Sequence, residues 1–82
     1  MYYTYVLRSL KNGRKYTGST EDLSRRLVEH NNGKSTYTRL NKPFELIYSE
    51  EYQTRQEAYK RERFFKTGKG RELLELILNT RP

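Results

Sequence analysis

The chain has 82 residues and no cysteine, so we expect one domain, residues 1–82, held together by packing, with neither disulfides nor a thiolate metal site. Its first residues lack a secretory signal and no segment is long and apolar enough to cross a bilayer, which predicts a cytoplasmic protein without a membrane partner. Because 17 lysines and arginines against 10 acidic residues give a formal net charge of +7, nucleic acid is the leading class of partner.

The first predicted element is a hairpin of two strands. Residues 2–10 are dense in aromatic and β-branched side chains, which are typical of a strand. Asn12-Gly13 tolerates the positive φ angles of a two-residue type I′ turn. We therefore expect Lys11 to face Arg14 and a second strand to run from Arg14 to about Ser19.

This register decides which side chains share a face of the hairpin. Tyr5 would lie opposite Thr20, so Tyr5 and Tyr16 would share one face, four residues out of register. Their rings would have to lean toward each other for the hydroxyls to meet. Gly18 lies on the same face, and its missing side chain would leave space for a phosphate or sugar to approach the backbone.

The third predicted element is a helix that presents two polar side chains in one stripe. Ser19-Thr20-Glu21-Asp22 has the form of a capping box, which predicts a helix through about His30. Leu23 and Leu27 are four residues apart and should pack inward. Arg26 and His30 have the same spacing and form the neighbouring stripe.

Arg26 and His30 are candidates for chemistry on a phosphate. A guanidinium binds two phosphate oxygens at once and neutralises charge that develops during a reaction, and an imidazole near neutral pH can move a proton. The alternatives are a solvated helix arginine and a histidine that stabilises the C-terminal end of the helix dipole. The two residues alone do not decide between these interpretations.

The stretch after the helix is polar and has no hydrophobic period. Residues 33–43 are rich in Gly, Ser, Thr and Lys, which predicts a mobile, basic surface loop that ends at Pro43. Cations here and in the preceding helix are candidate nucleic-acid contacts. They are Arg25, Lys34, Arg39 and Lys42.

The second half of the chain predicts one strand and two helices. Residues 44–52 form the strand, with Phe44, Leu46 and Tyr48 on one face. Thr54 to Glu57 form a second capping box, which begins a helix to about Lys66. After glycines 68 and 70, residues 71–79 form a short helix whose leucines and isoleucine would cover the sheet. The order ββαβαα predicts an α/β fold in which helices flank a small three-stranded antiparallel sheet.

Glu62 is unusual because it lies on the apolar face of its helix. It shares that face with Ala58 and Phe65, and a carboxylate there is costly unless it is paired. A divalent cation would pair it. An internal salt bridge to Arg61, Arg63 or another arginine would do the same, so both interpretations stay open.

Several of these candidates occur together in a recognisable order. They are Tyr3-Thr4-Tyr5, Tyr16-Thr17-Gly18, Arg26, His30 and Glu62. Taken together they resemble the GIY-YIG nuclease family, which includes small stand-alone bacterial proteins, and the resemblance covers nearly the whole chain.

The resemblance implies a mechanism for hydrolysis of a phosphodiester bond in DNA. One divalent ion, Mg²⁺ or Mn²⁺, would be bound by Glu62, and Arg26 would hold the non-bridging oxygens. Tyr16 would activate the attacking water while Tyr5 positions it and His30 accepts or relays the proton. Because a phenol in water titrates near pH ~10, that water can be activated only if the hydroxyl proton is drawn off.

Two other functions remain open at this point. The first triplet lacks the family's glycine, and no residue is assigned to an asparagine that larger members carry, so a nucleic-acid-binding module without useful catalysis is one alternative. A protein-interaction adaptor that uses the tyrosine-rich face is the other. The expected substrate is branched or damaged DNA, in repair or recombination. Since 82 residues leave no room for a separate DNA-binding domain, the choice of substrate would depend on the basic surface or on a protein partner.

Overall fold

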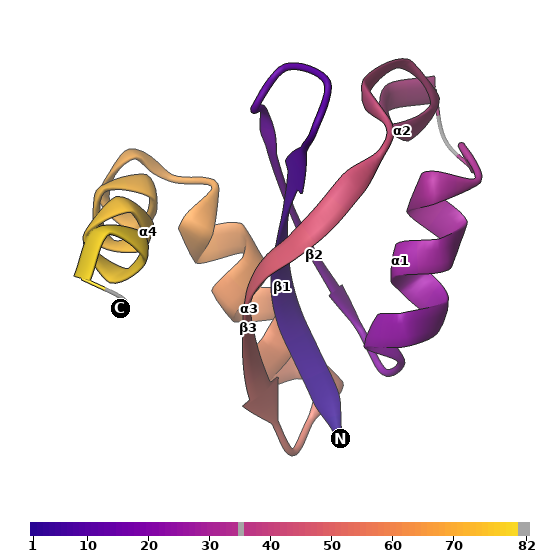
Figure 1. Cartoon of the computed structure of the whole chain (residues 1–82). Helices are drawn as coiled ribbons and strands as arrows, with labels where there is room; N and C mark the ends of the chain where they lie inside the picture. The colour runs from indigo at the N-terminus through magenta and orange to yellow at the C-terminus, as the bar shows by residue number, and fades with distance from the viewer. Residues whose placement is uncertain (35, 81–82) are drawn as a thin grey trace.

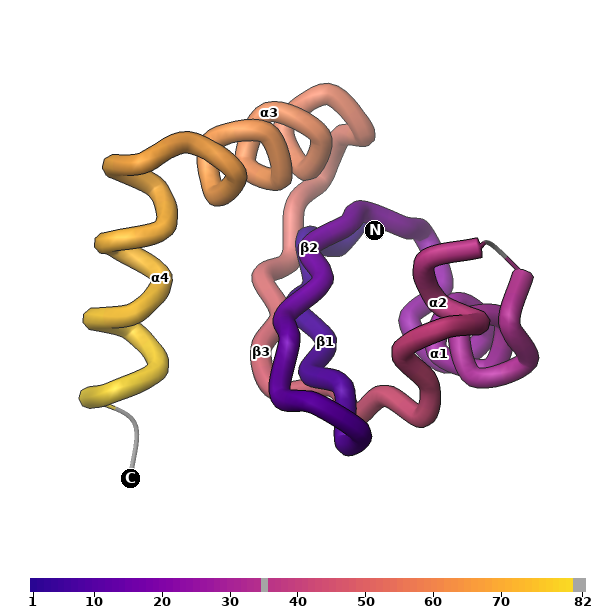
Figure 2. The backbone as a smooth tube through the Cα atoms, turned by 90° about the horizontal axis from the view of Figure 1, so that it is seen from above, coloured from indigo at the N-terminus to yellow at the C-terminus, as the bar shows by residue number. Residues whose placement is uncertain are grey.

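The computed structural model describes residues 1–34 and 36–80, which form a central antiparallel sheet with helices on both sides (Figures 1 and 2). In chain order the elements are β1 (Tyr2–Ser9), β2 (Lys15–Thr20), α1 (Leu23–Asn31), α2 (Thr36–Asn41), β3 (Phe44–Tyr52), α3 (Arg55–Phe65) and α4 (Gly68–Thr80). The strand order is β2-β1-β3. Helices α1 and α2 lie on one side of the sheet and α3 and α4 on the other (Figure 2). The predicted fold class is confirmed, with α2 as an additional helix.

The register of the β1–β2 hairpin differs by two residues from the expected one. Tyr5 lies opposite Gly18, and Leu7 lies opposite Tyr16. The turn is longer than two residues because the Ser9 amide donates to the Arg14 carbonyl at 2.8 Å and the Ser9 hydroxyl accepts from amides inside the turn. A shift of two preserves the faces, so Tyr5 and Tyr16 still share one face but are closer than expected.

Helix α1 begins later than the sequence predicted. Its N-cap is Asp22, whose side chain accepts from the Arg25 amide at 3.0 Å, and Ser19 belongs to β2. The predicted cap at Ser19 is therefore wrong, because pairing with β1 holds that residue in extended conformation. The predicted inward packing of Leu23 and Leu27 is confirmed, since both contact the apolar cluster on this side of the sheet.

The expected mobile loop over residues 33–43 is wrong for the part that forms α2. Thr38 and Asn41 are buried in this helix. The Asn41 side chain donates to the Tyr37 carbonyl at 2.7 Å and accepts from the Asn12 side chain at 2.6 Å. The bond from Asn12, which is distant in the sequence, fixes a polar segment that has no hydrophobic period of its own. Residue 35 lies outside the described residues.

A bulge in β3 changes which of its side chains face which helices. Val6 pairs with Tyr48 and Leu7 with Leu46, so the strand contains one extra residue, Ile47. Phe44 therefore packs with Leu7 on the α1 side, whereas Tyr48 packs with Val6 on the opposite side. The expected single face for Phe44, Leu46 and Tyr48 is wrong for this reason.

Helix α3 begins as predicted. Thr54 is its N-cap and accepts from the Glu57 amide at 3.2 Å, which confirms the capping residue. Ala58 and Phe65 are buried against the sheet. The face on which the sequence placed Glu62 therefore does point inward.

Helix α4 begins at Gly68 rather than at residue 71, because the Thr67 hydroxyl accepts from the Gly70 amide at 3.1 Å. A Cβ at Gly70 would lie 1.7 Å from the Phe64 carbonyl oxygen, so this glycine allows α3 and α4 to approach closely.

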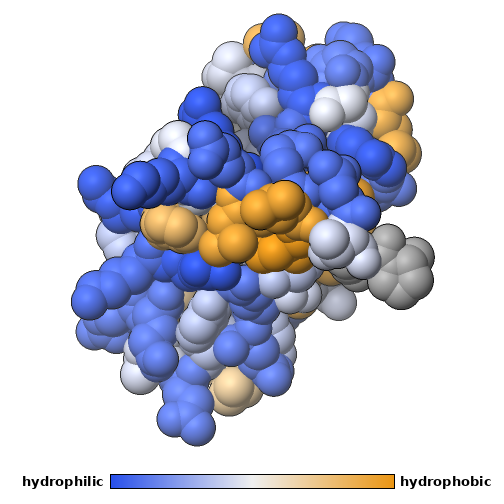
Figure 3. All heavy atoms as spheres, turned by 90° about the vertical axis from the view of Figure 1, so that its left-hand side faces the viewer, coloured by the Kyte–Doolittle hydropathy of each residue, from blue (hydrophilic) through white to orange (hydrophobic). Residues whose placement is uncertain are grey.

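The predicted packing of α4 on the sheet is confirmed for Leu74, Ile77 and Leu78. An apolar area remains exposed on the side of the molecule where α4 lies (Figure 3), and Leu76 of α4 is 62% exposed. Among the described residues no helix is long and apolar enough to cross a membrane.

Glu50 on β3 anchors the sheet to α3 through a polar network. Its carboxylate accepts from the hydroxyls of Tyr48 and Tyr52, each at 2.6 Å, and from Arg61 Nε at 2.8 Å. Burial acts to raise the pKa of Glu50, but the hydrogen bonds from Arg61, Tyr48 and Tyr52 outweigh it and lower the pKa below its usual value. The ionised carboxylate therefore stabilises the folded chain.

We expect Glu50→Gln to lower the free energy of unfolding at neutral pH by about 1–3 kcal/mol, because a charge-assisted network loses its acceptor. The pKa of Glu50 is lower in the folded chain than in the unfolded chain. Its contribution to stability is therefore complete above the unfolded-state pKa and is lost as the pH falls through the folded-state pKa. The difference between variant and parent should therefore shrink below about pH 4. Urea unfolding at several pH values measures this. Glu45→Gln, in a more exposed pair with Arg8, should cost less than about 1 kcal/mol; equal losses in the two variants would contradict the account.

Candidate functional site

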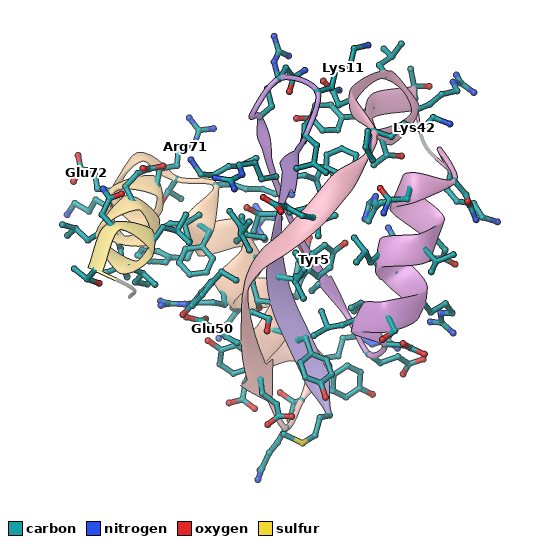
Figure 4. The ribbon with its side chains drawn as sticks, in the orientation of Figure 1. Tyr5, Lys11, Lys42, Glu50, Arg71 and Glu72 are labelled. Atoms are coloured by element: carbon teal, nitrogen blue, oxygen red, sulfur yellow. The ribbon has the colours of Figure 1, made fainter. Side chains whose placement is uncertain are left out.

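The Tyr5 side chain lies in the layer between the sheet and α1 (Figure 4) and is 2% exposed. Its hydroxyl oxygen is 2.9 Å from His30 Nε2 and accepts from Arg26 Nε at 3.4 Å. Arg26 and His30 are one turn apart on α1, as their spacing predicted, so both side chains reach the same hydroxyl. The structure thus brings three of the predicted site residues into one cluster.

The protonation states in this cluster follow from burial. Burial raises the pKa of Tyr5 to about 12, although Arg26 acts in the opposite direction. Burial, and then the nearby charge of Arg26, lower the pKa of His30. At neutral pH Tyr5 is therefore a neutral phenol and His30 a neutral imidazole that share one hydrogen bond, while Arg26 donates to the same hydroxyl oxygen. Tyr5 is suited to holding groups in place and not to accepting a proton.

Tyr16 contacts His30 through its ring and not through a hydrogen bond. The ring centroids are 4.8 Å apart in an edge-on arrangement, and Tyr16 also lies 5.5 Å from the Tyr37 ring. His30 is buried, and its Nε2 is bonded to Tyr5 instead. The expected meeting of the Tyr5 and Tyr16 hydroxyls is replaced by the Tyr5–His30 bond.

Gly18 has a different role from the one expected. A Cβ at this position would lie 2.4 Å from the Tyr5 hydroxyl oxygen. The space that the sequence left to a phosphate or sugar is therefore filled by the Tyr5 ring, because the register places the two residues opposite each other. Gly18 is required so that Tyr5 can lie flat across β2 and reach His30.

Gly18→Ala should consequently displace Tyr5 and break its bonds to α1. We expect the free energy of unfolding to fall by about 1–3 kcal/mol, as for other overpacked sites. Urea unfolding measures this. Gly68→Ala is the matched control, because nothing lies within 4 Å of a Cβ there; equal stability of the Gly18 variant and the parent would show that Tyr5 is not held in this way.

Glu62 approaches β2 from the α3 side, opposite to the Tyr5 cluster. One carboxylate oxygen accepts from the Ser19 hydroxyl at 2.8 Å and the other from Lys66 Nζ at 2.9 Å. The expected alternative of an internal salt bridge is thus present, with Lys66 as the partner instead of an arginine. The Glu62 side chain is 15% exposed, whereas that of Lys66 is 53% exposed. The lysine can therefore turn toward solvent and release the carboxylate.

The donor groups around Glu62 can be compared with what a divalent cation requires. Among the described residues there is no group of three or more histidine, cysteine, aspartate or glutamate side chains that could hold a metal ion. Mg²⁺ commonly keeps several waters and takes one or two carboxylates together with substrate phosphates. One carboxylate beside the Ser19 hydroxyl fits such a site, which substrate would complete.

A cleft of about 350 Å³ lies beside the end of β2. Arg25 and Arg26 line it from α1, Arg55 from α3 and Ser19 from β2. Arg26 is held there by Glu29, which accepts from its guanidinium at 3.1 Å. Glu21 and Glu29 also line the cleft, so its arginines outnumber its carboxylates by one, and its lining includes Ser19, which donates to Glu62.

The predicted nucleic-acid contacts are not all in one place. Arg25 lines the cleft. Lys34, Arg39 and Lys42 are exposed at or next to α2 and do not line it. Only Arg25 is therefore joined to the candidate site by the fold.

Four residues at or near the site were not predicted from the sequence to be site residues. They are Ser19, Tyr37, Arg55 and Lys66. Lys66 follows Glu62 by one helical turn, a spacing at which oppositely charged side chains pair, so this partner was detectable. Ser19 was not, because its face depends on strand pairing.

The chain is similar to known proteins of one family. Residues 1–74 match the GIY-YIG catalytic domain family. A UPF0213 protein of Staphylococcus saprophyticus is 39% identical over 77 residues, 93% of each chain, and one of Streptococcus agalactiae is 48% identical over 65 residues, 78% of this chain and 73% of that protein. The solution NMR structure of a UPF0213 protein from Bacillus halodurans matches with a TM-score of 0.55 and 34% identity, covering 94% of this chain and 85% of that one. The chain therefore belongs to the GIY-YIG domain family, within the group of UPF0213 proteins.

Proposed function

We propose that this protein is a metal-dependent endonuclease that hydrolyses phosphodiester bonds in DNA. The observation that carries the proposal is the convergence of two groups on β2. Tyr5, His30 and Arg26 reach it from the α1 side, and Glu62 reaches it from the α3 side through Ser19. A phosphate at this edge would meet a guanidinium from one side and a carboxylate suited to a cation from the other.

Each side chain has a task that its surroundings support. Arg26 is charged and lines the cleft, so it would bind the non-bridging oxygens of the phosphate. Tyr5 and His30 are positioning residues, because both are buried and bonded to each other. Tyr16 is partly exposed and would orient the attacking water, accepting a proton from it as its own hydroxyl proton passes to solvent.

Glu62 would hold the divalent ion, Mg²⁺ or Mn²⁺, after Lys66 has released it. When bound, such an ion polarises the phosphate and stabilises the leaving 3′ oxygen. Lys66 is then free to neutralise a neighbouring phosphate.

The net charge of +7 supports a polyanionic substrate. We propose that the protein acts in the cytoplasm on branched or damaged DNA, in repair or recombination, and that a protein partner contributes to the choice of substrate. The domain is too small to carry a second DNA-binding unit within these residues.

A panel of labelled nucleic acids tests the proposal. Single-stranded, duplex, nicked and branched DNA, with matching RNA, would be incubated with Mg²⁺, with Mn²⁺ and with a chelator. We expect at least one DNA structure to be cut with metal and none with chelator. Absence of cleavage across the whole panel would contradict the function.

A second function is favoured by one observation, the ion pair of Glu62 with Lys66. If that pair persists when nucleic acid binds, the carboxylate is not available to a cation and the protein is a binding module. Such a module would bind members of the panel equally with Mg²⁺ and with chelator and would cut none of them.

A further inference from the structure

A second and larger groove lies at the other end of β2. Its volume is about 810 Å³, and it is bounded by the β1–β2 turn, β2, α2 and the junction of α3 with α4. Its basic lining residues are Arg14, Lys15, Lys66 and Arg71, and its aromatic ones are Tyr16, Tyr37 and Phe65. Arg71 lies near the beginning of α4 (Figure 4). Among these residues Tyr16 and Lys66 also touch the candidate site, so the groove adjoins it.

The cations of the groove are available to a ligand. Arg14 and Arg71 are exposed, and neither forms an ion pair within the described part of the chain. Lys15 is paired with Glu75 at 2.9 Å, but its side chain remains 36% exposed. Two guanidinium groups without carboxylate partners on facing walls of a groove suit the phosphates of a nucleic-acid backbone.

The aromatic side chains of the groove indicate which part of a nucleic acid it can bind besides the phosphates. The Tyr16 and Tyr37 rings are 5.5 Å apart, inclined by 33°, and both are partly exposed. Nucleic-acid bases stack on such rings when they are not paired within a duplex. Rings that line a groove beside cations are thus suited to unpaired bases.

The groove, the candidate site and the cleft follow one another along β2. Lys15 to Thr17 line the groove, and Ser19 and Thr20 line the cleft. Glu62 connects the two, since it is bonded to Ser19 on one side and to Lys66 on the other. A strand that lies along this edge would therefore pass Glu62 between two basic depressions.

We propose that the groove binds a single-stranded nucleic-acid segment next to the bond that is cut, with Arg14 and Arg71 on its phosphates and its bases against Tyr16 and Tyr37. The position of the cut bond rests on the function proposed above, whereas binding of the strand does not require cleavage. The substrate class that follows is DNA with an unpaired segment beside a duplex, such as a flap or a splayed end.

The test measures binding of a fluorescent single-stranded oligonucleotide by anisotropy, in chelator so that no cleavage occurs. The double variant Arg14→Ala with Arg71→Ala should raise Kd about 10-fold or more at about 0.1 M salt. It should also reduce the slope of log K against log salt by about 1.4, or ~0.7 for each lost phosphate contact.

A matched double variant, Lys60→Ala with Arg63→Ala, removes the same charge from exposed positions of α3 outside the groove and should leave Kd within about 3-fold, as expected for unspecific electrostatics. Equal weakening in the two double variants would overturn the proposal. The proposal would also be overturned if a duplex of the same sequence bound the parent protein as tightly as the single strand and lost as much affinity in the Arg14→Ala, Arg71→Ala double variant. Because chelator is present throughout, a protein that fails to cleave the DNA panel can still give the expected result here.

Discussion

Glu62→Gln is expected to reduce metal-dependent cleavage by at least about 100-fold, because a neutral amide binds a divalent cation much more weakly than a carboxylate does and leaves the charge of the transition state unbalanced. The substitution preserves the shape of the side chain and an oxygen that can accept from the Ser19 hydroxyl. It removes only the ion pair with Lys66, which at (i, i+4) spacing is worth about 0.3–0.5 kcal/mol. The fold should therefore remain intact, and cleavage rates under single-turnover conditions report the loss.

The control for this variant is Glu72→Gln. Glu72 is exposed on α4 (Figure 4), and its replacement by glutamine removes the same charge from a helix surface outside the candidate site. It should cut DNA at a rate within about 2-fold of the parent, as is usual for surface substitutions. Retained metal-dependent activity in Glu62→Gln would exclude this carboxylate as the metal ligand.

Tyr16→Phe should lower the cleavage rate by about 100-fold or more, the size of effect usual for loss of a general base. The phenylalanine ring keeps its packing against His30 and Tyr37, so the change removes a hydroxyl and little else. Single-turnover rates with saturating protein separate this effect from binding. Stability measured by urea should change by less than about 1 kcal/mol.

Tyr37→Phe is the control because it removes a hydroxyl from the neighbouring ring and keeps its stacking surface. We expect near-normal cleavage. Tyr5→Phe gives the other comparison, since it leaves His30 and Arg26 without their shared partner and should lower stability by about 1–2 kcal/mol. If Tyr16→Phe and Tyr37→Phe were equally active, the water would have to be activated by another group.

The fold class followed from local patterns, and its errors arose where distant residues decide. The Thr54 cap and the apolar spacing of Leu23 with Leu27 lie within single elements and predicted α3 and the buried face of α1. The hairpin register depends on how the Ser9 side chain folds the turn, and the bulge at Ile47 follows from packing on both faces of β3. Neither the hairpin register nor the bulge can be recognised from the spacing of apolar residues in the sequence.

The candidate site was predictable to the same degree. Arg26 and His30 are four residues apart on one helix, and that spacing alone places them beside each other, where Tyr5 meets both. The contact of Glu62 with Ser19 joins residues 43 positions apart and follows from strand pairing. Lys34, Arg39 and Lys42 were judged by charge alone, which does not specify direction.

The most direct test of the central claim is mass spectrometry of the products when the protein cuts DNA with Mg²⁺ in water labelled with oxygen-18. Metal-dependent hydrolysis at Glu62 predicts products with a 5′ phosphate that contains one labelled oxygen and a 3′ hydroxyl, formed with metal and absent with chelator. Intact DNA under every condition, or cut products without solvent oxygen, would contradict the account.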